Sequence, residues 1–211
     1  MKSLLLFPFL LLLSLPNCFA QTTDFQTWST VSLQKSFSKK ISVTLQQELR
    51  LDDNSTQFHL TFTDAEFKYK LTKWFNATAN YRFIVKPDEI DHRIYSDLYY
   101  LWKNKKIEAE LRLRVQHEFV PNDVDENYLR PKLELSYKIK KKWEPYISEE
   151  LFYHVLYYKG DKFDESRLSA GTHYDFDKRN SIKAYYMYEQ EFNVNDALHA
   201  HVLGVAYEYD F

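Results

Sequence analysis

Charged side chains in the segment Ile107–Phe119 alternate strictly with apolar ones. Glu108, Glu110, Arg112 and Arg114 occupy every second position, which places their side chains on one face of an extended strand. Carboxylates and guanidiniums that share a face can pair with neighbouring strands, or they can set the charge selectivity of a polar passage. The spacing therefore predicts electrostatic chemistry and identifies no reaction.

Two other pairs of polar residues were tested for catalytic or metal chemistry. Ser148 and His154 have the same parity, but six residues along a strand correspond to roughly 20 Å, too far for a nucleophile and its base. His199 and His201 share a face at a spacing that suits a metal ion, yet the sequence fixes no third ligand beside them. We therefore assign no catalytic residue, no metal site and no cofactor, and we expect the chain not to be an enzyme.

The alternation of Ile107–Phe119 recurs along most of the chain and predicts strands. Ten of them have 11 to 14 residues and Arg167–Phe176 has ten, more than the roughly 5 to 6 usual in soluble sheets and close to what a tilted membrane-spanning strand needs. No window of similar length has a helical period. The predicted strands are Phe25–Lys35, Ile41–Leu51, Phe58–Leu71, Phe75–Val85, His92–Trp102, Ile107–Phe119, Leu129–Ile139, Pro145–Val155, Arg167–Phe176, Ile182–Phe192 and Leu198–Phe211.

Short basic connections alternate with longer acidic or neutral ones between these strands. Ser38–Lys40 and Lys140–Lys142 represent the first kind, and Val120–Asn127 and Leu156–Glu165 the second. Transmembrane barrels have short turns at the periplasmic end and longer loops outside. We therefore expect the basic turns on the periplasmic side, with an aromatic girdle beside them. The membrane-interface aromatic candidates are Trp74, Trp102, Trp143, Tyr207, Tyr209 and Phe211.

The predicted fold is an all-β transmembrane antiparallel β-barrel, an up-and-down meander of about 10–12 strands. Eleven strand signals conflict with the even strand number of bacterial barrels. Either Phe25–Lys35 is not a wall strand, which leaves ten, or a missed strand makes twelve. A soluble barrel of the lipocalin type, with its apolar faces inward, is the alternative. Glu149 breaks the pattern because its parity points it at lipid, so we expect a local bulge or a shielded position there.

Residues 1–20 are typical of a cleaved secretory signal peptide, with Lys2, an apolar run and the small residue Ala20. A retained anchor, or a lipoprotein acylated at Cys18, is the alternative. Cleavage after Ala20 removes the single cysteine, which excludes disulfides, and leaves residues 21–211 as a single outer-membrane barrel domain. Without Lys2, 27 of the 28 basic residues remain against all 30 acidic ones, so a nucleic acid partner is not expected.

The last predicted strand ends on an aromatic residue. Leu203, Val205, Tyr207 and Tyr209 occupy alternate positions before Phe211. This pattern resembles the terminal strand of bacterial outer-membrane barrels, which the barrel insertion machinery reads. The resemblance implies that this machinery and outer-membrane lipid are the partners of the chain.

Nearly the whole chain also resembles a family of uncharacterised outer-membrane β-barrel proteins, the domain of unknown function 2490. The resemblance rests on Trp28, the strand end Leu49-Arg50, the segment Pro145–Phe152 and the terminal Phe211. It implies the barrel fold and the bacterial outer membrane as the location. It implies no catalytic activity, because the family has none assigned.

Charges on the inward parity are expected to line a narrow lumen. The main hypothesis is a structural or binding barrel whose interior is held together by salt bridges. A narrow pore for small polar solutes is the first alternative and an outer-membrane hydrolase with an unassigned site is the second; the oligomeric state stays open. The lumen-lining candidates are Glu48, Arg50, Glu66, Lys68, Arg82, Asp97, Glu108, Glu110, Arg112, Arg114, Arg130, Lys132, Glu134, Glu150 and Glu189.

Overall fold

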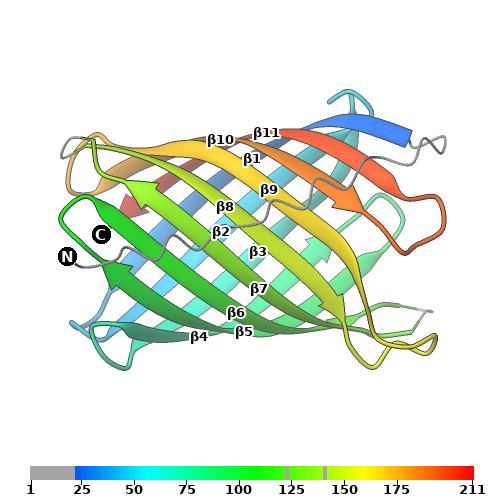
Figure 1. The fold of residues 1–211 in the computed structure, drawn as a ribbon, viewed down its shortest axis with the longest axis horizontal. Coiled ribbons are helices and arrows are strands. Elements are labelled where there is room, and N and C mark those ends of the chain that lie inside the picture. The colour runs from blue at the N-terminus through cyan, green and yellow to red at the C-terminus, as the bar shows by residue number, and fades with distance from the viewer. Residues whose placement is uncertain (1–21, 122–123, 140–141) are drawn as a thin grey trace, which may run out of the picture.

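The computed structural model describes residues 22–121, 124–139 and 142–211, which form eleven strands closed into a barrel (Figure 1). The predicted signal peptide lies outside the described residues. Within these ranges no helix is both long and apolar enough to cross a membrane. The strands are β1 (Thr22–Ser36), β2 (Ile41–Asp52), β3 (Gln57–Lys70), β4 (Phe75–Val85), β5 (Ile90–Lys103), β6 (Ile107–Phe119), β7 (Glu126–Tyr137), β8 (Trp143–His154), β9 (Lys162–Asp175), β10 (Asn180–Glu191) and β11 (Leu198–Asp210).

Consecutive strands pair in an antiparallel meander, which confirms the predicted all-β barrel. β1 and β11 close it and run parallel, with Thr22 opposite Leu198 and Gln34 opposite Asp210. The expectation of an even number, ten or twelve, is therefore wrong: the segment Phe25–Lys35 belongs to a wall strand. An odd-numbered meander closes only where its first and last strands run in the same direction. As a result β1 begins at the end of the barrel that carries the longer loops, whereas β11 ends beside the short turns.

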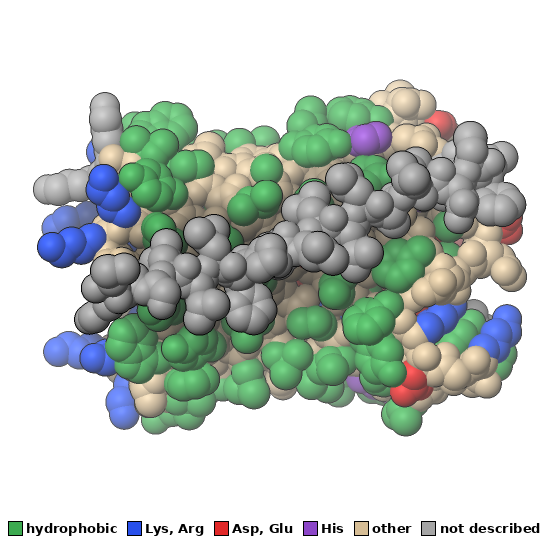
Figure 2. All heavy atoms as spheres, in the orientation of Figure 1, with side chains coloured by type: hydrophobic (Ala, Val, Ile, Leu, Met, Phe, Trp, Pro, Cys, Tyr) green, Lys and Arg blue, Asp and Glu red, His purple; other side chains and the backbone are tan. Residues whose placement is uncertain are grey.

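Alternate side chains of each strand face opposite sides of the wall. In β6, Val115 is 60% exposed whereas its neighbour Arg114 is only 7% exposed. The apolar side chains point outward and the charged ones point into the lumen, the opposite of a soluble lipocalin-type barrel. Figure 2 shows hydrophobic side chains spread over the outer surface, with lysines and arginines at both ends of the barrel and more of them at the turn end.

β9 begins five residues before its predicted start. Tyr153 of β8 pairs with Phe163, and Phe152 pairs with Glu165. Asp164 is thus the extra residue of a β-bulge, which shifts the parity of the strand. The shift hides this part of β9 from a search for a period of two.

The predicted bulge or shielded position at Glu149 is wrong. β8 is regular at this residue, which pairs with Leu133 of β7 and Leu168 of β9. The Glu149 side chain is exposed on the outer face of the wall. The nearest irregularity of the β8–β9 pairing lies three residues further on, at Phe152 and Tyr153.

Inward aromatic side chains pack closely beside the β1–β11 seam. The ring of Tyr185 lies against Gly204, where an added Cβ would be 2.0 Å from a ring carbon, so only glycine fits. Tyr185 also packs on the buried cluster that contains Trp28 and Val202. Because parallel pairing is slightly less stable per residue, these contacts reinforce the wall where it closes.

Candidate functional site

Three adjoining cavities follow one another along the lumen within the described residues. One of 300 Å³ lies toward the loops (the loop-side cavity), one of 360 Å³ lies in the middle, and one of 620 Å³ lies toward the turns (the turn-side chamber). Each neighbouring pair shares four lining residues, which form the junction between them. The arginine junction, between the loop-side and middle cavities, consists of Glu48, Arg82, Arg114 and Arg167. The lysine junction, between the middle cavity and the chamber, consists of Tyr99, Arg112, Lys132 and Lys183.

The loop-side cavity has a cationic lining. Seven lysine or arginine side chains and four carboxylates line it, an excess of three positive charges, and six of the seven cations are arginines. The middle cavity has six cations against three carboxylates. Guanidinium groups therefore surround the arginine junction on several sides.

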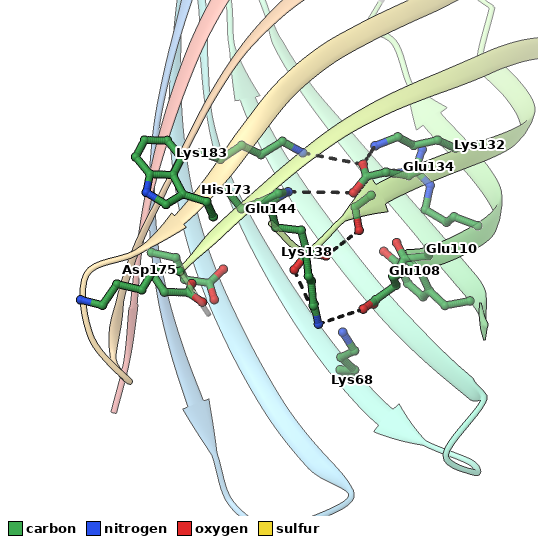
Figure 3. A pocket seen from close by; sticks show the side chains of 16 residues that line it. Lys68, Glu108, Glu110, Lys132, Glu134, Lys138, Glu144, His173, Asp175 and Lys183 are labelled. Carbon is green, nitrogen blue, oxygen red and sulfur yellow. Dashed lines mark hydrogen bonds and ion pairs between the residues drawn. The ribbon is translucent and has the colours of Figure 1, made fainter. Parts of the chain in front are cut away.

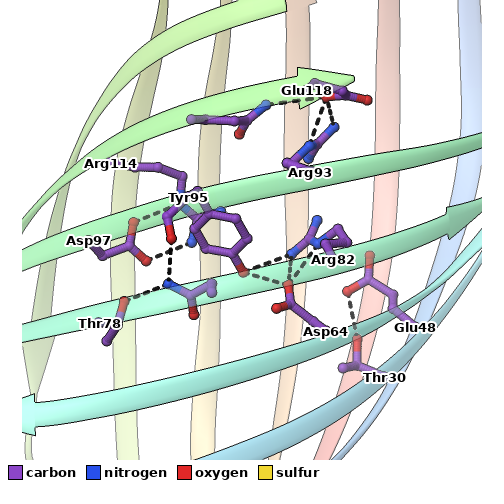
Figure 4. Close-up of polar contacts among 12 residues, drawn as sticks. Thr30, Glu48, Asp64, Thr78, Arg82, Arg93, Tyr95, Asp97, Arg114 and Glu118 are labelled. Atoms are coloured by element: carbon purple, nitrogen blue, oxygen red, sulfur yellow. Dashed lines mark hydrogen bonds and ion pairs between the residues drawn. The ribbon is translucent and has the colours of Figure 1, made fainter. Parts of the chain in front are cut away.

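Buried carboxylates lie behind these guanidiniums. Arg114 donates to both oxygens of Asp97, at 2.7 and 2.8 Å, and Asp97 is 1% exposed. Arg82 donates to Asp64 at 2.7 Å, and the Tyr95 hydroxyl donates to the same carboxylate (Figure 4). A buried ion that loses its partner is costly, so these carboxylates hold the guanidiniums in fixed positions on the wall.

Glu150 joins two arginines from different strands. Its carboxylate accepts hydrogen bonds from Arg112 of β6 and from Arg130 of β7, the latter at 2.8 Å. Arg167 of β9 has a similar place further round the wall, where it pairs with Glu189 of β10 at 2.7 Å. The two ionic groups, one on β6 to β8 and one on β9 and β10, adjoin where Glu150 is the register partner of Arg167.

Aromatic rings support the guanidiniums from the side. The Arg82 guanidinium lies 3.7 Å from the ring centroid of Phe62, and that of Arg130 lies 3.9 Å from the centroid of Phe152. Cation–π contacts of this kind favour guanidinium because it is planar and stacks. The stacking keeps these groups flat against the wall.

The turn-side chamber is lined mainly by lysines. Five lysines and one arginine face six carboxylates, so its formal charge is balanced apart from His173. Lys132 pairs with Glu134 at 3.0 Å, whereas Lys183 reaches the same carboxylate only at 3.8 Å (Figure 3). Within the described ranges, Lys68 has no ion pair. The chamber therefore holds its charges more loosely than the arginine junction does.

The ion pairs of the lumen follow the wall. Those between two strands join adjacent or next-but-one strands throughout the described residues, with one exception. The exception is the long contact between Lys183 of β10 and Glu134 of β7. No pair of the described chain spans the diameter of the eleven-stranded ring, so the network lies along the wall.

All fifteen lumen-lining candidates lie on inward positions of the strands. Thirteen of them line one or more of the three cavities. The other two, Asp97 and Glu189, lie behind the lining and bind Arg114 and Arg167. The candidates are therefore of two kinds: thirteen side chains exposed to the cavities, and two carboxylates behind them that hold arginines in place.

The aromatic interface candidates gather at the turn end. Trp74, Trp102, Trp143 and Phe211 are exposed beside the short turns, and Trp143 also lines the chamber. Tyr207 and Tyr209 are half-buried at the last two outward positions of β11.

The two pairs considered for catalysis or metal binding are engaged elsewhere. Nδ1 of His201 contacts the Tyr186 hydroxyl, on the outer face. Ser148 lines the middle cavity, whereas His154 lies further along β8 with its Nδ1 3.2 Å from Asp164. A search of the described residues finds no group of three or more histidine, cysteine, aspartate or glutamate side chains that could hold a metal ion.

Sequence reasoning missed the aromatic residues that face the lumen. Trp28, Phe62, Tyr95 and Phe152 are inward and buried, and each is within contact of a guanidinium. Their position in the alternation shows that they face the lumen, since Phe62 lies two residues before the inward Asp64. A lumen predicted from charged residues alone leaves such aromatic residues out.

Solved structures share this fold. The NanC porin matches 89% of this chain and 99% of its own at 12% identity and a TM-score of 0.54. The KdgM porin, solved in complex with disordered oligogalacturonate, matches 81% of this chain and 91% of its own at 12% identity and a TM-score of 0.50. This likeness shows a porin-like barrel fold.

Among curated proteins nothing matches the chain. A family model described as "Protein of unknown function (DUF2490)" matches residues 25–199, which runs from β1 to the start of β11. The match covers most of the barrel and agrees with the resemblance seen in the sequence. The chain therefore belongs to the DUF2490 family, as a porin-like β-barrel whose specific role is unassigned.

Proposed function

We propose that this barrel spans the bacterial outer membrane and passes small polar solutes, with a preference for anions at the arginine junction. The outward apolar side chains support the membrane placement, since lipid is the environment that suits a wall apolar outside and charged inside. The exposed tryptophans beside the turns suit an interface with lipid headgroups.

The observation that supports the pore function is the succession of three cavities along the lumen. The three cavities adjoin through shared side chains from the loop end to the turn end. The ion pairs keep the charged groups on the wall, and the stacked rings keep the guanidiniums flat. Among the described residues no ion pair joins opposite walls; the longest reach is from Lys183 of β10 to Glu134 of β7.

The cationic lining supports anion preference. The guanidiniums line the loop-side cavity while carboxylate partners such as Asp64 and Asp97 lie buried behind them, so an anion that enters meets positive charge at closer range than negative charge. The KdgM porin, which has a similar fold, was solved with an anionic oligosaccharide. In this chain the arginine junction would set selectivity and the balanced chamber would pass what the junction admits.

Export and insertion follow the same proposal. The signal-peptide pattern of residues 1–20 supports secretion. Phe211 follows β11 at the turn end, and its amide donates to Gln34 of β1 at 2.9 Å. We infer that the turn end faces the periplasm, where the insertion machinery would bind the terminal strand, and that outer-membrane lipid surrounds the wall.

The experiment begins with extracted, folded protein. An unboiled sample should migrate faster on a denaturing gel than a boiled one, because an intact barrel stays compact. The protein is then reconstituted in liposomes, and flux is compared between a neutral and an anionic sugar of equal size. We expect the anion to pass faster at 0.1 M salt. This advantage should shrink at 1 M salt, where the Debye length falls from about 10 Å to about 3 Å.

The outcomes separate the three hypotheses. A folded barrel in a bilayer that stays as tight as protein-free liposomes would reject the pore and favour a structural or binding barrel. Equal flux of both sugars would reject the anion preference alone. Hydrolysis of an ester or peptide substrate by the purified barrel would support the enzyme alternative.

A further inference from the structure

Glu149 presents a carboxylate on the outer face of the wall, midway along β8. Its partners in the sheet are Leu133 and Leu168, and Ile147 and Leu151 flank it on its own strand. Among the described residues no group binds its side chain. A charged group that faces hydrocarbon is costly, and ionisable residues at membrane depth usually have a partner. The carboxylate therefore points to something other than lipid.

A second polar defect lies beside Glu149. The β7–β8 pairing includes Leu129 with Tyr153 and Lys132 with Glu150, but it omits the positions between them. Pro131 lies in this gap and has no N–H to donate. Backbone groups left without partners are also costly in lipid, so the outer surface of β7 and β8 is poorly suited to lipid at two adjacent places.

The far wall carries a polar cluster of complementary chemistry. Gln47 of β2 is exposed on the outer face, where its amide nitrogen donates to Thr61 at 2.7 Å and its oxygen accepts from Thr63 at 2.5 Å. A primary amide has two N–H donors, so one of them stays available to an acceptor outside this barrel. A carboxylate is such an acceptor.

Glu149 and Gln47 lie at the same height on opposite walls. Each is the seventh residue of its strand counted from the turn end, and the strands of one barrel tilt alike. β2 and β8 are five strands apart by the shorter way round the ring of eleven. In Figure 1, β8 belongs to the near wall and β2 to the far wall. The two side chains cannot meet within one barrel, but they can meet between two barrels that stand side by side.

We propose that Glu149 of one copy docks against Gln47 of a second copy, so that the barrels associate through opposite walls. The partner is a second copy of this chain because its own outer surface supplies the missing donor at the correct height. The two surfaces are different, so the contact is heterologous and extends into rows or rings instead of closing as a two-fold dimer. This inference rests on the membrane placement proposed above and is independent of solute flux.

Cysteine pairing tests the contact directly. The double variant Gln47→Cys/Glu149→Cys is made in a chain whose single natural cysteine is Cys18, and it is oxidised in the membrane. Because packed sheets lie about 10 Å apart and a disulfide needs Cα atoms within about 7 Å, a short thiol-reactive cross-linker is used alongside oxidation. We expect covalent dimers and a ladder of larger species. Each single variant should stay monomeric, because a heterologous contact does not bring two copies of the same residue together.

A matched control uses Leu113→Cys/Tyr186→Cys, which are outward residues at the seventh positions of β6 and β10. An equal ladder in the control would mean random collision and would overturn the proposal. Dimers of Glu149→Cys alone would mean a two-fold contact and would also overturn it.

A second measurement needs no cysteine. The oligomer distribution of gently extracted wild type is compared with Glu149→Leu and Gln47→Leu by native mass spectrometry. Both variants should lose at least tenfold of the oligomer while keeping the gel shift of a folded barrel, and an unchanged distribution would overturn the contact. A barrel that associates yet passes no solute would reject only the pore.

Discussion

The loop-side half of the lumen and the turn-side chamber carry the same kinds of charge but hold them differently. Arginines dominate the first, six of seven cations, and lysines the second, five of six. Around the arginines, carboxylates such as Asp97 are completely buried and bonded at about 2.7 to 2.8 Å. In the chamber, Lys183 reaches its carboxylate only at 3.8 Å.

This difference follows from the two side chains. Guanidinium is planar, stays charged and forms two parallel bonds to one carboxylate, whereas a lysine ammonium is a mobile point charge on a flexible stem. A fixed charge suits a selective junction in a narrow cavity, and a mobile charge suits a wide chamber. Under the proposed function the arginine half is both the more stable half and the selective half, and each prediction below tests one side of this contrast.

The largest expected effect is on Glu150→Gln. This change removes the carboxylate that holds Arg112 and Arg130 and leaves two guanidiniums without their shared negative charge. Breaking a buried ion pair costs about 3–5 kcal/mol. We expect a loss of that size in the free energy of unfolding, measured in urea by the fraction that keeps the fast gel mobility.

Glu110→Gln is the matched control, because Glu110 lines the chamber and has no ion pair among the described residues. We expect it to change the unfolding free energy by less than about 1 kcal/mol. Equal losses in the two variants would remove the distinction between the tight half and the loose half.

Lys86 comes next, at the loop mouth of the arginine half. It pairs with the fully buried Asp91 at 2.6 Å. Burial lowers the pKa of Lys86, but hydrogen bonds to Asp91 and Glu89 outweigh burial and raise the pKa above its ordinary value. Lys86→Met leaves the Asp91 carboxylate without a partner and should cost about 1–3 kcal/mol of unfolding free energy near pH 7.

The pH dependence of this pair has a definite sign. Because the folded pKa of Lys86 is raised, the stabilisation is fully present below the unfolded value of about 10.4 and is lost as pH rises through the folded value. The difference between wild type and Lys86→Met should therefore shrink in alkaline solution. A difference that stays constant up to pH 12 would show that the ion pair is not its cause.

Selectivity should respond to Arg50→Gln. Arg50 lines the loop-side cavity and pairs with Glu48 at 2.7 Å, so the change lowers the cationic excess there by one charge. A unit charge at 4 Å in water is worth about 1 kcal/mol, or roughly fivefold. We expect the anion-to-cation permeability ratio, measured from the reversal potential in a salt gradient, to fall by about that factor. Lys68→Gln in the wider chamber should change it less, and the reverse order would move the selective region to the chamber.

The individual strands of this barrel could be predicted from the sequence because a period of two is a local signal. Each strand of the meander was found from its own residues, and the inward charges followed from parity. Closure was not predictable in this way. The parallel pairing of β1 with β11 is a contact between the ends of the chain, and the rule of even strand number led to the wrong expectation at Phe25–Lys35.

The sequence also could not predict which inward charged residues form ion pairs with one another. Parity places Glu150 inside but does not say that it accepts from Arg112, two strands away, since this depends on strand tilt and side-chain reach. The aromatic rings on which guanidiniums stack, such as Phe62 under Arg82, were missed. An aromatic residue at an inward position interrupts the alternation of charged and apolar residues that was used to find the lumen. The regular strand at Glu149 shows the converse, a residue that breaks the pattern where the backbone does not.

The smallest expected effect is on Lys138→Gln, at the turn mouth of the chamber. Lys138 contacts Glu108 at 3.4 Å and Glu144 at 3.6 Å, and its side chain is 46% exposed. Exposed pairs of this kind contribute about 0–1 kcal/mol, so the unfolding free energy should change by less than about 0.5 kcal/mol. Urea unfolding of Lys138→Gln and Glu150→Gln under the same conditions compares their losses of unfolding free energy directly. A loss near that of Glu150→Gln would mean that the chamber holds its lysines as rigidly as the junction holds its arginines, and the assignment of selectivity to the junction would lose its physical basis.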